Sequence, residues 1–548
     1  MQNPSLIQIK SLFLPDNNYF SYMNKVFLGI TLIFMLSCGC SGNVSSTSAG
    51  KGDGKHVSMT EAMPVTGTFI NLAYQDVRNK YTNPPYIDNT DPLMWAAKIA
   101  EMKRMGMEYL VFMAVANEFR SFYPSQMMPW AYPVWRKSPV DAIMDAAARF
   151  DMKVFLSTGW AQNQDDNLRD PGIKGQQMMI MNELAFRYKD HPAFYGWYLP
   201  VEDCLGPVLT DYAVEAANEF TARARELTPS AKILISPYGI FNSDFDDPRY
   251  EEQILKLEVD IIAYQDEVGC VRERYPLPRL RENWKKLRAI HDKTDIEMWA
   301  NCESFTWEKG TNDRSSALIP APYGRFLAQQ VAAAEGGADR IISFMICGLF
   351  DDPASPYQLG QPHWSACAFE DYMSWKDGGR YWELVEASMS GSLRNGPEWS
   401  GTNVAGKDRE EAVLISDGKT AEEDAGDEGW CRYKAGKNEI FIAFEEPVEL
   451  EEVMVRMLHS AKDGIVPPSR MHLSASMDGN EWVVVRIKEA HACPNTGHDA
   501  FADCILFDNL IIPKSKQGTM KPSYLKISFV AESKVFIDEV YVNPVIVE

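Results

Sequence analysis

Between Val65 and Phe350 the chain repeats one pattern: a short apolar segment, a polar loop and an amphipathic stretch. This feature constrains the fold most, because strands that alternate with helices form a parallel sheet. Eight segments are predicted as strands: 65–74, 107–117, 153–160, 194–203, 232–239, 260–269, 296–305 and 340–350. Eight such units in about 290 residues are the number and size of a (β/α)8 TIM barrel.

A doubly wound open sheet is the competing arrangement, since it uses the same alternation. A dinucleotide-binding sheet of that kind carries a glycine-rich loop after its first strand. The corresponding segment here, 71–80, reads NLAYQDVRNK and contains no glycine. We therefore predict a closed barrel over residues 62–380.

Polar side chains gather where several predicted strands end. The fourth strand reads GWYLPVED and ends in Glu202 and Asp203, the sixth ends in YQDE (264–267) and the seventh in NCE (301–303). Asp351 and Asp352 follow the eighth. In a (β/α)8 barrel the active site lies at the carboxyl ends of the strands, so these residues are functional candidates.

Glu202 and Glu303 are the candidate catalytic pair. Cleavage of a glycosidic bond needs a carboxylic acid to protonate the leaving oxygen and a carboxylate to attack the anomeric carbon or activate water. The two glutamates end strands three apart in an eight-strand ring, so they can face each other across the barrel mouth. The competing interpretation is that each caps a helix or pairs with an arginine, and Asp203, Asp266 and Glu267 remain rival carboxylates.

A further set of residues is predicted to contact substrate. Sugar rings have apolar C–H faces that stack on aromatic rings, although core packing is the simpler interpretation for most of the 14 tryptophans. Asn301 shares a strand face with Glu303 at period two and could orient it. The predicted set is Trp160, Tyr264, Gln265, Asp266, Asn301 and Trp307.

Glutamates at the ends of strands four and seven resemble the large retaining clan of glycoside hydrolases. The resemblance implies that Glu202 is the acid/base, that Glu303 is the nucleophile and that Tyr264 is the tyrosine often found near the end of strand six. That clan usually has Asn directly before the strand-four glutamate, and this chain has Val201 there. The usual contact with the sugar 2-hydroxyl is therefore in doubt.

A narrower resemblance is carried by GWYLPVED, by CESF (302–305) and by the N-terminal signal described below. These look like a family of Bacteroides-type secreted barrels, the domain-of-unknown-function 4434 type. The resemblance implies a glycoside-hydrolase-like fold and does not imply a particular sugar.

After about Tyr381 the pattern changes to period-two alternation, and an Asp-Gly turn lies at 478–479. We predict a β-sandwich over 381–548. The segments 414–420, 439–457, 464–482 and 535–542 resemble, in order, the discoidin-like (coagulation factor type C) sandwich, a galactose-binding-like accessory domain with a jelly-roll fold. The resemblance implies a structural calcium ion bound by Asp417 and Glu539, whose oxygen ligands suit calcium; a metal-free sandwich is the alternative.

The N-terminus resembles a bacterial lipoprotein signal. From Met23 the chain carries one lysine, an apolar stretch and then small residues, which is typical of a secretory signal. Residues 35–38, MLSC, resemble a lipobox and imply lipidation of Cys38, with a non-lipidated cleaved signal as the alternative. We expect residues 1–40 to be upstream segment and signal, 41–61 to be a tether, and the mature protein to be lipid-anchored in the bacterial cell envelope, periplasmic or on the outer-membrane surface.

Composition excludes several other classes. Lys and Arg total 54 against 76 Asp and Glu, a net charge of −22, which disfavours nucleic acid and does not hinder neutral carbohydrate. Eight histidines and no Cys-x-x-Cys disfavour a catalytic metal, so no cofactor is expected for catalysis, and Cys493 with Cys504 is the most plausible disulfide. The leading hypothesis is a secreted glycoside hydrolase. A non-catalytic glycan-binding lipoprotein and a protein-interaction scaffold are the alternatives.

Overall fold

The computed structural model describes residues 59–72, 88–159, 168–270, 277–307, 317–360, 362–397, 399, 412–460, 463–489, 500–515 and 518–547. The chain divides into two units, 1–56 and 57–548, and every described residue belongs to the second. Several sequence predictions lie outside the described residues: the signal with Cys38, the tether up to residue 58, Trp160, and Cys493 of the expected disulfide.

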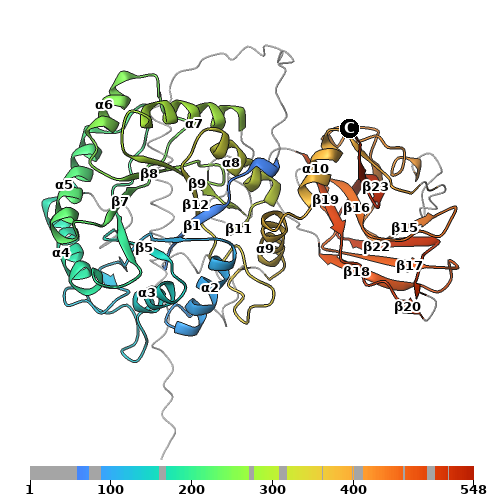
Figure 1. The fold of residues 1–548 in the computed structure, drawn as a ribbon, viewed down its shortest axis with the longest axis horizontal. Helices are drawn as coiled ribbons and strands as arrows, with labels where there is room; N and C mark the ends of the chain where they lie inside the picture. Colours follow the sequence, from blue (N-terminus) through green and yellow to red (C-terminus); the bar gives the residue numbers. More distant parts are fainter. Residues whose placement is uncertain are drawn as a thin grey trace, which may run out of the picture. The chain divides into compact units, whose positions relative to one another are not determined.

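Eight parallel strands close into a barrel, as the repeated pattern predicted (Figure 1). Around the ring the order is β1-β12-β9-β8-β7-β6-β5-β2. The strands are β1 (Val65–Ile70), β2 (Tyr109–Phe112), β5 (Lys153–Ser157), β6 (Phe194–Tyr198), β7 (Lys232–Ile235), β8 (Ile261–Gln265), β9 (Glu297–Glu303) and β12 (Arg340–Phe344).

Helices surround this ring (Figure 1). Four of them begin with Pro directly after an Asp or Ser whose side chain accepts a backbone N–H, which satisfies donors that the first helical turn leaves free. The capping residues are Asp91, Ser138, Asp170 and Asp247. The helices are α2 (Pro92–Arg104), α3 (Pro139–Arg149), α4 (Pro171–Tyr188), α5 (Asp211–Leu227), α6 (Pro248–Lys256), α7 (Leu277–His291), α8 (Tyr323–Glu335) and α9 (Pro362–Lys376).

Alternation along each strand separates two cores. One apolar cluster takes side chains from all eight strands and therefore fills the barrel interior; in β8 it contains Ile261 and Ala263. The next residues, Ile262 and Tyr264, belong to the larger cluster between strands and helices. A one-residue step along a strand thus moves a side chain from the barrel axis to the helix layer.

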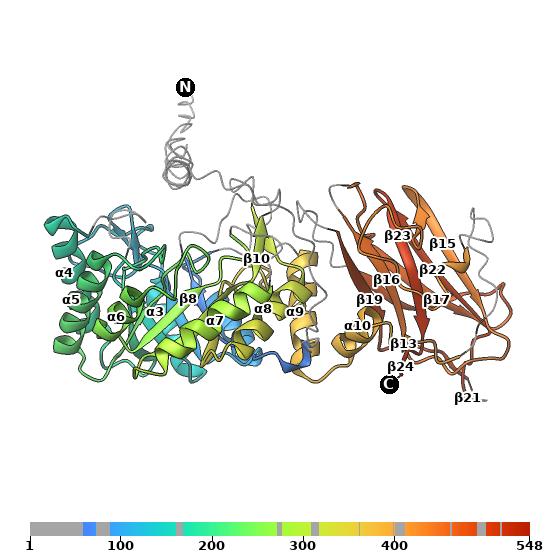
Figure 2. The same ribbon diagram turned by 90° about the horizontal axis from the view of Figure 1, so that it is seen from above.

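Short hairpins extend two of the loops that follow barrel strands. β3 (Ala116–Asn117) pairs with β4 (Arg120–Ser121), and β10 (Phe305–Trp307) pairs with β11 (Leu318–Pro320). Figure 2 shows β10 at the edge of the barrel, above α8. Both hairpins lie on the face where the carboxyl ends of the strands open.

The C-terminal part is the predicted β-sandwich. Two antiparallel four-stranded sheets enclose one apolar cluster, in the orders β14-β23-β16-β19 and β15-β22-β17-β18. Their strands are β14 (Cys431–Tyr433), β15 (Gly436–Ala443), β16 (Val453–His459), β17 (Arg470–Ser476), β18 (Val483–Glu489), β19 (Phe501–Phe507), β22 (Tyr524–Ala531) and β23 (Val535–Val542). Asp478 and Gly479 turn between β17 and β18 as expected, and Gly479 has φ +75°.

The start of this region differs from the prediction. Residues Tyr381–Met389 form helix α10, ahead of the sandwich strands, and the Tyr381 hydroxyl donates to the Cys504 carbonyl at 2.8 Å. Short paired segments complete the fold: η1 (Met59–Glu61), β13 (Leu393–Arg394) with β24 (Val545–Ile546), and β20 (Lys514–Ser515) with β21 (Gly518–Thr519). Among the described residues, no helix has the length and apolar character needed to span a bilayer.

Candidate active site

Glu303 is the last residue of β9, and its side chain lies on the inner face of the barrel. Trp299 belongs to the interior cluster, so Asn301 and Glu303 share its face, as period two predicted. The Glu303 side chain is only 5% exposed, and its Oε2 accepts the Cys270 backbone N–H at 2.5 Å. Burial raises the pKa of Glu303 well above its ordinary value, and the neighbouring Asp266 raises it further.

Asp266 lies behind Glu303 and not in the barrel mouth. It is fully buried, and its carboxylate accepts hydrogen bonds from Val268 N at 3.2 Å, Glu303 N at 3.1 Å and Gln329 Nε2 at 2.6 Å. Burial raises the pKa of Asp266, while these hydrogen bonds lower it. The prediction that Asp266 contacts substrate does not fit this position, because Asp266 follows the inward-facing Gln265 by one residue and turns toward α8.

Glu202 and Gln265 are brought together at the mouth. Glu202 follows β6 and is exposed, whereas Gln265 ends β8. The Gln265 amide donates to Glu202 Oε1 at 3.0 Å and to the Ser236 carbonyl at 2.9 Å. The strand ends expected to converge therefore do so, and Gln265 contacts a predicted catalytic carboxylate directly.

Asn301 lies one layer below Glu303. Its Nδ2 donates to Ser236 Oγ at 3.3 Å, and Ser236 in turn donates to the Ala263 carbonyl at 2.7 Å. This hydrogen bond ties Asn301 to the end of β7 and not to Glu303. Its buried Oδ1 has no hydrogen-bond partner within the described part of the chain.

Tyr264 points away from the site, which corrects its predicted role in substrate contact. It is fully buried in the helix layer, where its hydroxyl lies 3.1 Å from the Tyr250 hydroxyl and 2.9 Å from His291 Nε2. The physical reason is strand parity: Gln265 faces the mouth, so Tyr264 must face the helices. Burial also lowers the pKa of His291 to about 4, so this contact is with a neutral imidazole.

Trp307 does not present a ring to the mouth. It is 4% exposed in the β10–β11 hairpin, and its indole N–H donates to the Cys270 carbonyl at 3.1 Å. The expected stacking of a sugar on Trp307 is therefore at odds with the structure. This residue instead holds the loop whose Cys270 N–H contacts Glu303.

Several residues of the site escaped sequence reasoning. Gln329 and Arg325 lie on α8, and each donates to the Glu303 carbonyl, both at 3.1 Å. Tyr238 also lies near the pair, and Glu202 contributes to its raised pKa after burial and Cys204. Glu267, which the sequence did place among the rival carboxylates, contributes to the raised pKa of Glu303. The one available signal was the pair Gln329–Gln330, two polar residues inside an otherwise apolar helix segment.

The predicted calcium ligands lie close together in the sandwich. Glu539 is fully buried, and its Oε1 accepts Gly418 N at 2.5 Å and Lys419 N at 3.1 Å. Burial raises the pKa of Glu539 to about 8, with further contributions from Asp538 and the exposed Asp417. Its Oε2 has no hydrogen-bond partner among the residues described. In the described ranges, no group of three or more His, Cys, Asp or Glu side chains could hold a metal ion.

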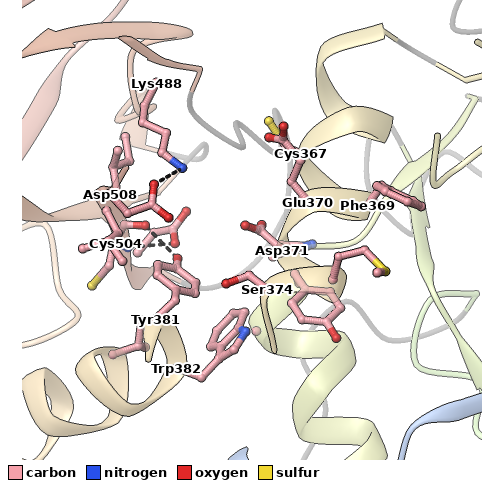
Figure 3. Close-up of a pocket in the computed structure, with 18 of the residues that line it drawn as sticks. Cys367, Phe369, Glu370, Asp371, Ser374, Tyr381, Trp382, Lys488, Cys504 and Asp508 are labelled. Carbon is pink, nitrogen blue, oxygen red and sulfur yellow. Dashed lines mark hydrogen bonds and ion pairs between the residues drawn. The ribbon is translucent and has the colours of Figure 1, made fainter. Parts of the chain in front are cut away.

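A separate cavity of about 1000 Å³ is lined by none of the predicted catalytic, substrate-contact or calcium-binding residues (Figure 3). Of the acidic residues singled out at the strand ends, Asp352 lines it. It is lined by α9, α10 and the β18–β19 region, and Asp371, Tyr381 and Trp382 face it. Burial raises the pKa of Asp371 to about 7 and that of Asp503 to about 6. The cavity therefore has an acidic lining. Neither Glu202 nor Glu303 lines it, although Arg325, which donates to the Glu303 carbonyl, does.

The sequence model of the family described as "Domain of unknown function (DUF4434)" matches residues 65–357. The chain belongs to this family. The match begins at β1 and extends past β12, so the family domain is the barrel itself with both candidate carboxyl residues. A search of curated proteins found no match.

Three solved structures have low similarity to the DUF4434 chain. A candidate alpha-L-fucosidase from Bacteroides thetaiotaomicron is 17% identical, with a TM-score of 0.46 over 61% of this chain and 99% of that one. GH5_18 from Streptomyces cattleya, in complex with Manb1-4GlcNAc, is 15% identical, with a TM-score of 0.37 over 58% and 82%. An F5/8 type C domain from Bacteroides fragilis is 13% identical, with a TM-score of 0.20 over 28% and 96%. None of these similarities assigns an activity.

Proposed function

We propose that this protein is a glycoside hydrolase that cleaves a glycan with Glu202 and Glu303 as its two catalytic carboxyl groups. The observation that carries the proposal is the contrast between these two groups. Glu303 is almost fully buried beside Asp266, whereas Glu202 is exposed and accepts a hydrogen bond from Gln265. Burial favours the protonated form of Glu303. A pair in which one carboxyl group keeps its proton can divide acid and carboxylate roles at one pH.

The reaction that fits this pair is two-step hydrolysis with retention. One carboxyl group protonates the leaving oxygen while the other attacks the anomeric carbon, and water then hydrolyses the glycosyl-enzyme ester. The polar contact usually made by Asn before the strand-four glutamate has no counterpart, because Val201 is buried in the apolar cluster between strands and helices. Any hydrogen bond to the sugar 2-hydroxyl must therefore come from another residue.

We also propose the remaining features of the mature protein. Lipidation of Cys38 would tether it in the cell envelope, its partner would be carbohydrate, and contact with a membrane would run only through the lipid. In the sandwich, Glu539 Oε2 and Asp417 supply oxygen ligands of the kind calcium prefers, and a buried carboxylate atom without a partner suits a cation. Backbone carbonyls would have to complete such a site.

The test uses purified protein that begins after residue 40, incubated with a panel of plant and host glycans. Released sugars are identified by chromatography, and the anomer formed first is read by NMR. Glu202→Gln and Glu303→Gln are each expected to abolish release, while Glu252→Gln, which changes an exposed glutamate on α6, should leave it intact. Release that survives either site substitution contradicts that assignment. Retention of a glycan without cleavage would favour the glycan-binding lipoprotein.

A further inference from the structure

We propose that Asp266 and Gln329 form a buried clamp that keeps Glu303 protonated, so that Glu303 and not Glu202 delivers the proton to the leaving group. The inference rests on the proposed glycosidase function for its chemical consequence. It reverses the roles that the resemblance to the retaining clan implies. Asp266 and Gln329 act in it as positioning residues, because they reach substrate only through Glu303.

The clamp holds both peptide groups of Glu303. Asp266 Oδ1 accepts the Glu303 N–H at 3.1 Å, and Gln329 Nε2 donates to the Glu303 carbonyl at 3.1 Å. The same Nε2 donates to Asp266 Oδ2 at 2.6 Å, which joins the two halves of the clamp. Asp266 and Gln329 are both fully buried, so water does not compete for these hydrogen bonds.

Donor counting decides which of the two neighbouring carboxyl groups carries the charge. Asp266 accepts three N–H groups, whereas Glu303 accepts one, from Cys270 to Oε2. Two adjacent buried carboxylates cannot both ionise without a large cost, and hydrogen bonds to the charged form favour it. Asp266 is therefore the anion, and Glu303 keeps its proton.

The proton has a defined place on Glu303. Oε2 is occupied as the acceptor for Cys270 N–H, so the proton sits on Oε1. Among the described residues, none donates a hydrogen bond to Oε1. This atom is therefore the one available to a glycosidic oxygen.

Other charged groups near Glu303 do not reverse this assignment. The carboxylate of Glu267 raises the pKa of Glu303, as Asp266 does, and the guanidinium of Arg325 lowers it by less than burial raises it. Burial raises the pKa of the adjacent Cys302 thiol well above its ordinary value, so that group stays neutral. Arg325 Nη2 donates to the carbonyls of Glu303 at 3.1 Å and of Phe305 at 2.6 Å.

In these roles Glu303 is the general acid and base and Glu202 is the nucleophile, and each proton that Glu303 gives up is returned to it. The proton moves from Glu303 Oε1 to the leaving oxygen as the glycosidic C–O bond breaks, and the exposed carboxylate of Glu202 forms the new bond to the anomeric carbon. Water attacks this ester in the second step. Glu303 takes the proton from that water, which returns both groups to their starting states.

Asp266→Asn tests the clamp without any substrate. Asn has nearly the same shape, and Gln329 can turn its amide to accept from the new side chain because Gln329 Oε1 has no described partner. That turn ends the donation from Gln329 Nε2 to the Glu303 carbonyl, to which Arg325 also donates. Infrared difference spectra against Glu303→Gln isolate the C=O stretch of protonated Glu303. In the wild type this band should persist at pH values where an ordinary glutamate is ionised, and in Asp266→Asn its titration midpoint should fall by about 1 unit or more. Asp246→Asn, a surface aspartate paired with Lys286, should leave the midpoint unchanged.

A second variant keeps the test valid if Asp266→Asn fails to fold. Gln329→Met removes one donor from Asp266 and preserves volume, so the proton shared by the pair shifts toward Asp266 and the Glu303 band should again titrate at lower pH. A wild-type Glu303 that is already ionised at pH 6, or midpoints that both variants leave unmoved, would overturn the clamp.

Kinetics separate this inference from the proposed function. Once a cleaved glycan is known, Asp266→Asn should move the alkaline limb of the kcat/KM profile to lower pH and leave the acid limb in place. Movement of the acid limb alone would identify Glu303 as the nucleophile and refute the reversed roles. If no glycan is cleaved but the infrared shifts occur, the clamp stands and the glycosidase proposal fails.

Discussion

The Gln265 side chain donates from Nε2 to Glu202 Oε1 at 3.0 Å, so the end of β8 holds the carboxylate that follows β6. The same nitrogen donates to the Ser236 carbonyl beyond β7 at 2.9 Å. One amide thus connects three consecutive strand ends of the barrel. This connection fixes where Glu202 lies even though Glu202 itself is exposed.

Replacing Gln265 should therefore weaken catalysis more than stability. Gln265→Ala removes a hydrogen bond to a charged group worth about 1.5–3 kcal/mol, and kcat/KM should fall by roughly 10- to 150-fold. The melting temperature should change little, because water can reach Glu202 in place of the amide. Initial rates and thermal melts of the same preparation check this, and a large loss of stability with unchanged kcat/KM would show that Gln265 only supports the fold.

Lys98 should be essential for barrel closure. Its buried ammonium contacts Asp351 Oδ1 at 2.7 Å, Glu101 Oε2 at 2.5 Å and the Tyr357 carbonyl at 3.0 Å, and so ties α2 to the segment after β12. Lys98→Met leaves two buried carboxylates without a counter-charge. We expect a loss of about 3–5 kcal/mol in unfolding free energy.

The measurement for Lys98 is denaturation by urea, with Lys103→Met as the matched control on the exposed face of the same helix. That control should cost well under about 1 kcal/mol. Equal losses from both substitutions would contradict the view that the buried ion pairs close the barrel.

Stability without calcium should fall as pH rises. Folding raises the pKa of Glu539 to about 8, so the folded state holds a proton that the unfolded state releases near pH 4.5. That stabilising contribution is complete below about pH 4.5 and is lost as pH rises through about 8. In the presence of a chelator, the sandwich should therefore melt several degrees lower at pH 8 than at pH 5.

Adding calcium provides a second test of Glu539, because the ion should bind the ionised carboxylate and stabilise it. Added calcium should raise the pH 8 melting temperature by binding the ionised carboxylate, and Glu539→Gln should remove that increase. Differential scanning calorimetry at both pH values measures the melting temperature of the wild type and of Glu539→Gln, with and without calcium. A calcium response that persists in Glu539→Gln would place the ion elsewhere.

The buried Glu303 carboxyl group should lower the stability of the folded protein at high pH, although the proposed function requires it. Because burial and Asp266 raise the pKa of Glu303, ionising it at high pH destabilises the folded state. Glu303→Gln should abolish glycan cleavage yet raise the melting temperature at pH 8 relative to the wild type, with a smaller gain at pH 5. A uniform decrease at both pH values would indicate that the amide disrupts the hydrogen bond from Cys270.

Local patterns in the sequence were enough to predict most helices, strands and turns and their order along the chain. The helix starts at Asp91, Ser138, Asp170 and Asp247 follow from a capping side chain and the next proline, which act within one turn. The Asp-Gly turn at 478–479 is equally local. Repetition of strand and helix then leaves few ways to bury the apolar faces, and the closed barrel is one of them.

What the sequence by itself determined is therefore the barrel, the sandwich and the strand ends that carry Glu202 and Glu303. Tertiary structure alone decided which side chains enter the mouth, because a one-residue step exchanges the two faces of a strand, and Tyr264 was assigned to the wrong face. Tertiary structure alone also brought together Asp266, Gln329 and Glu303. Gln329 lies 26 residues beyond Glu303 in sequence, and only the packing of α8 on β9 brings its amide to Asp266 and to the Glu303 carbonyl, in a place where both Asp266 and Gln329 are fully buried.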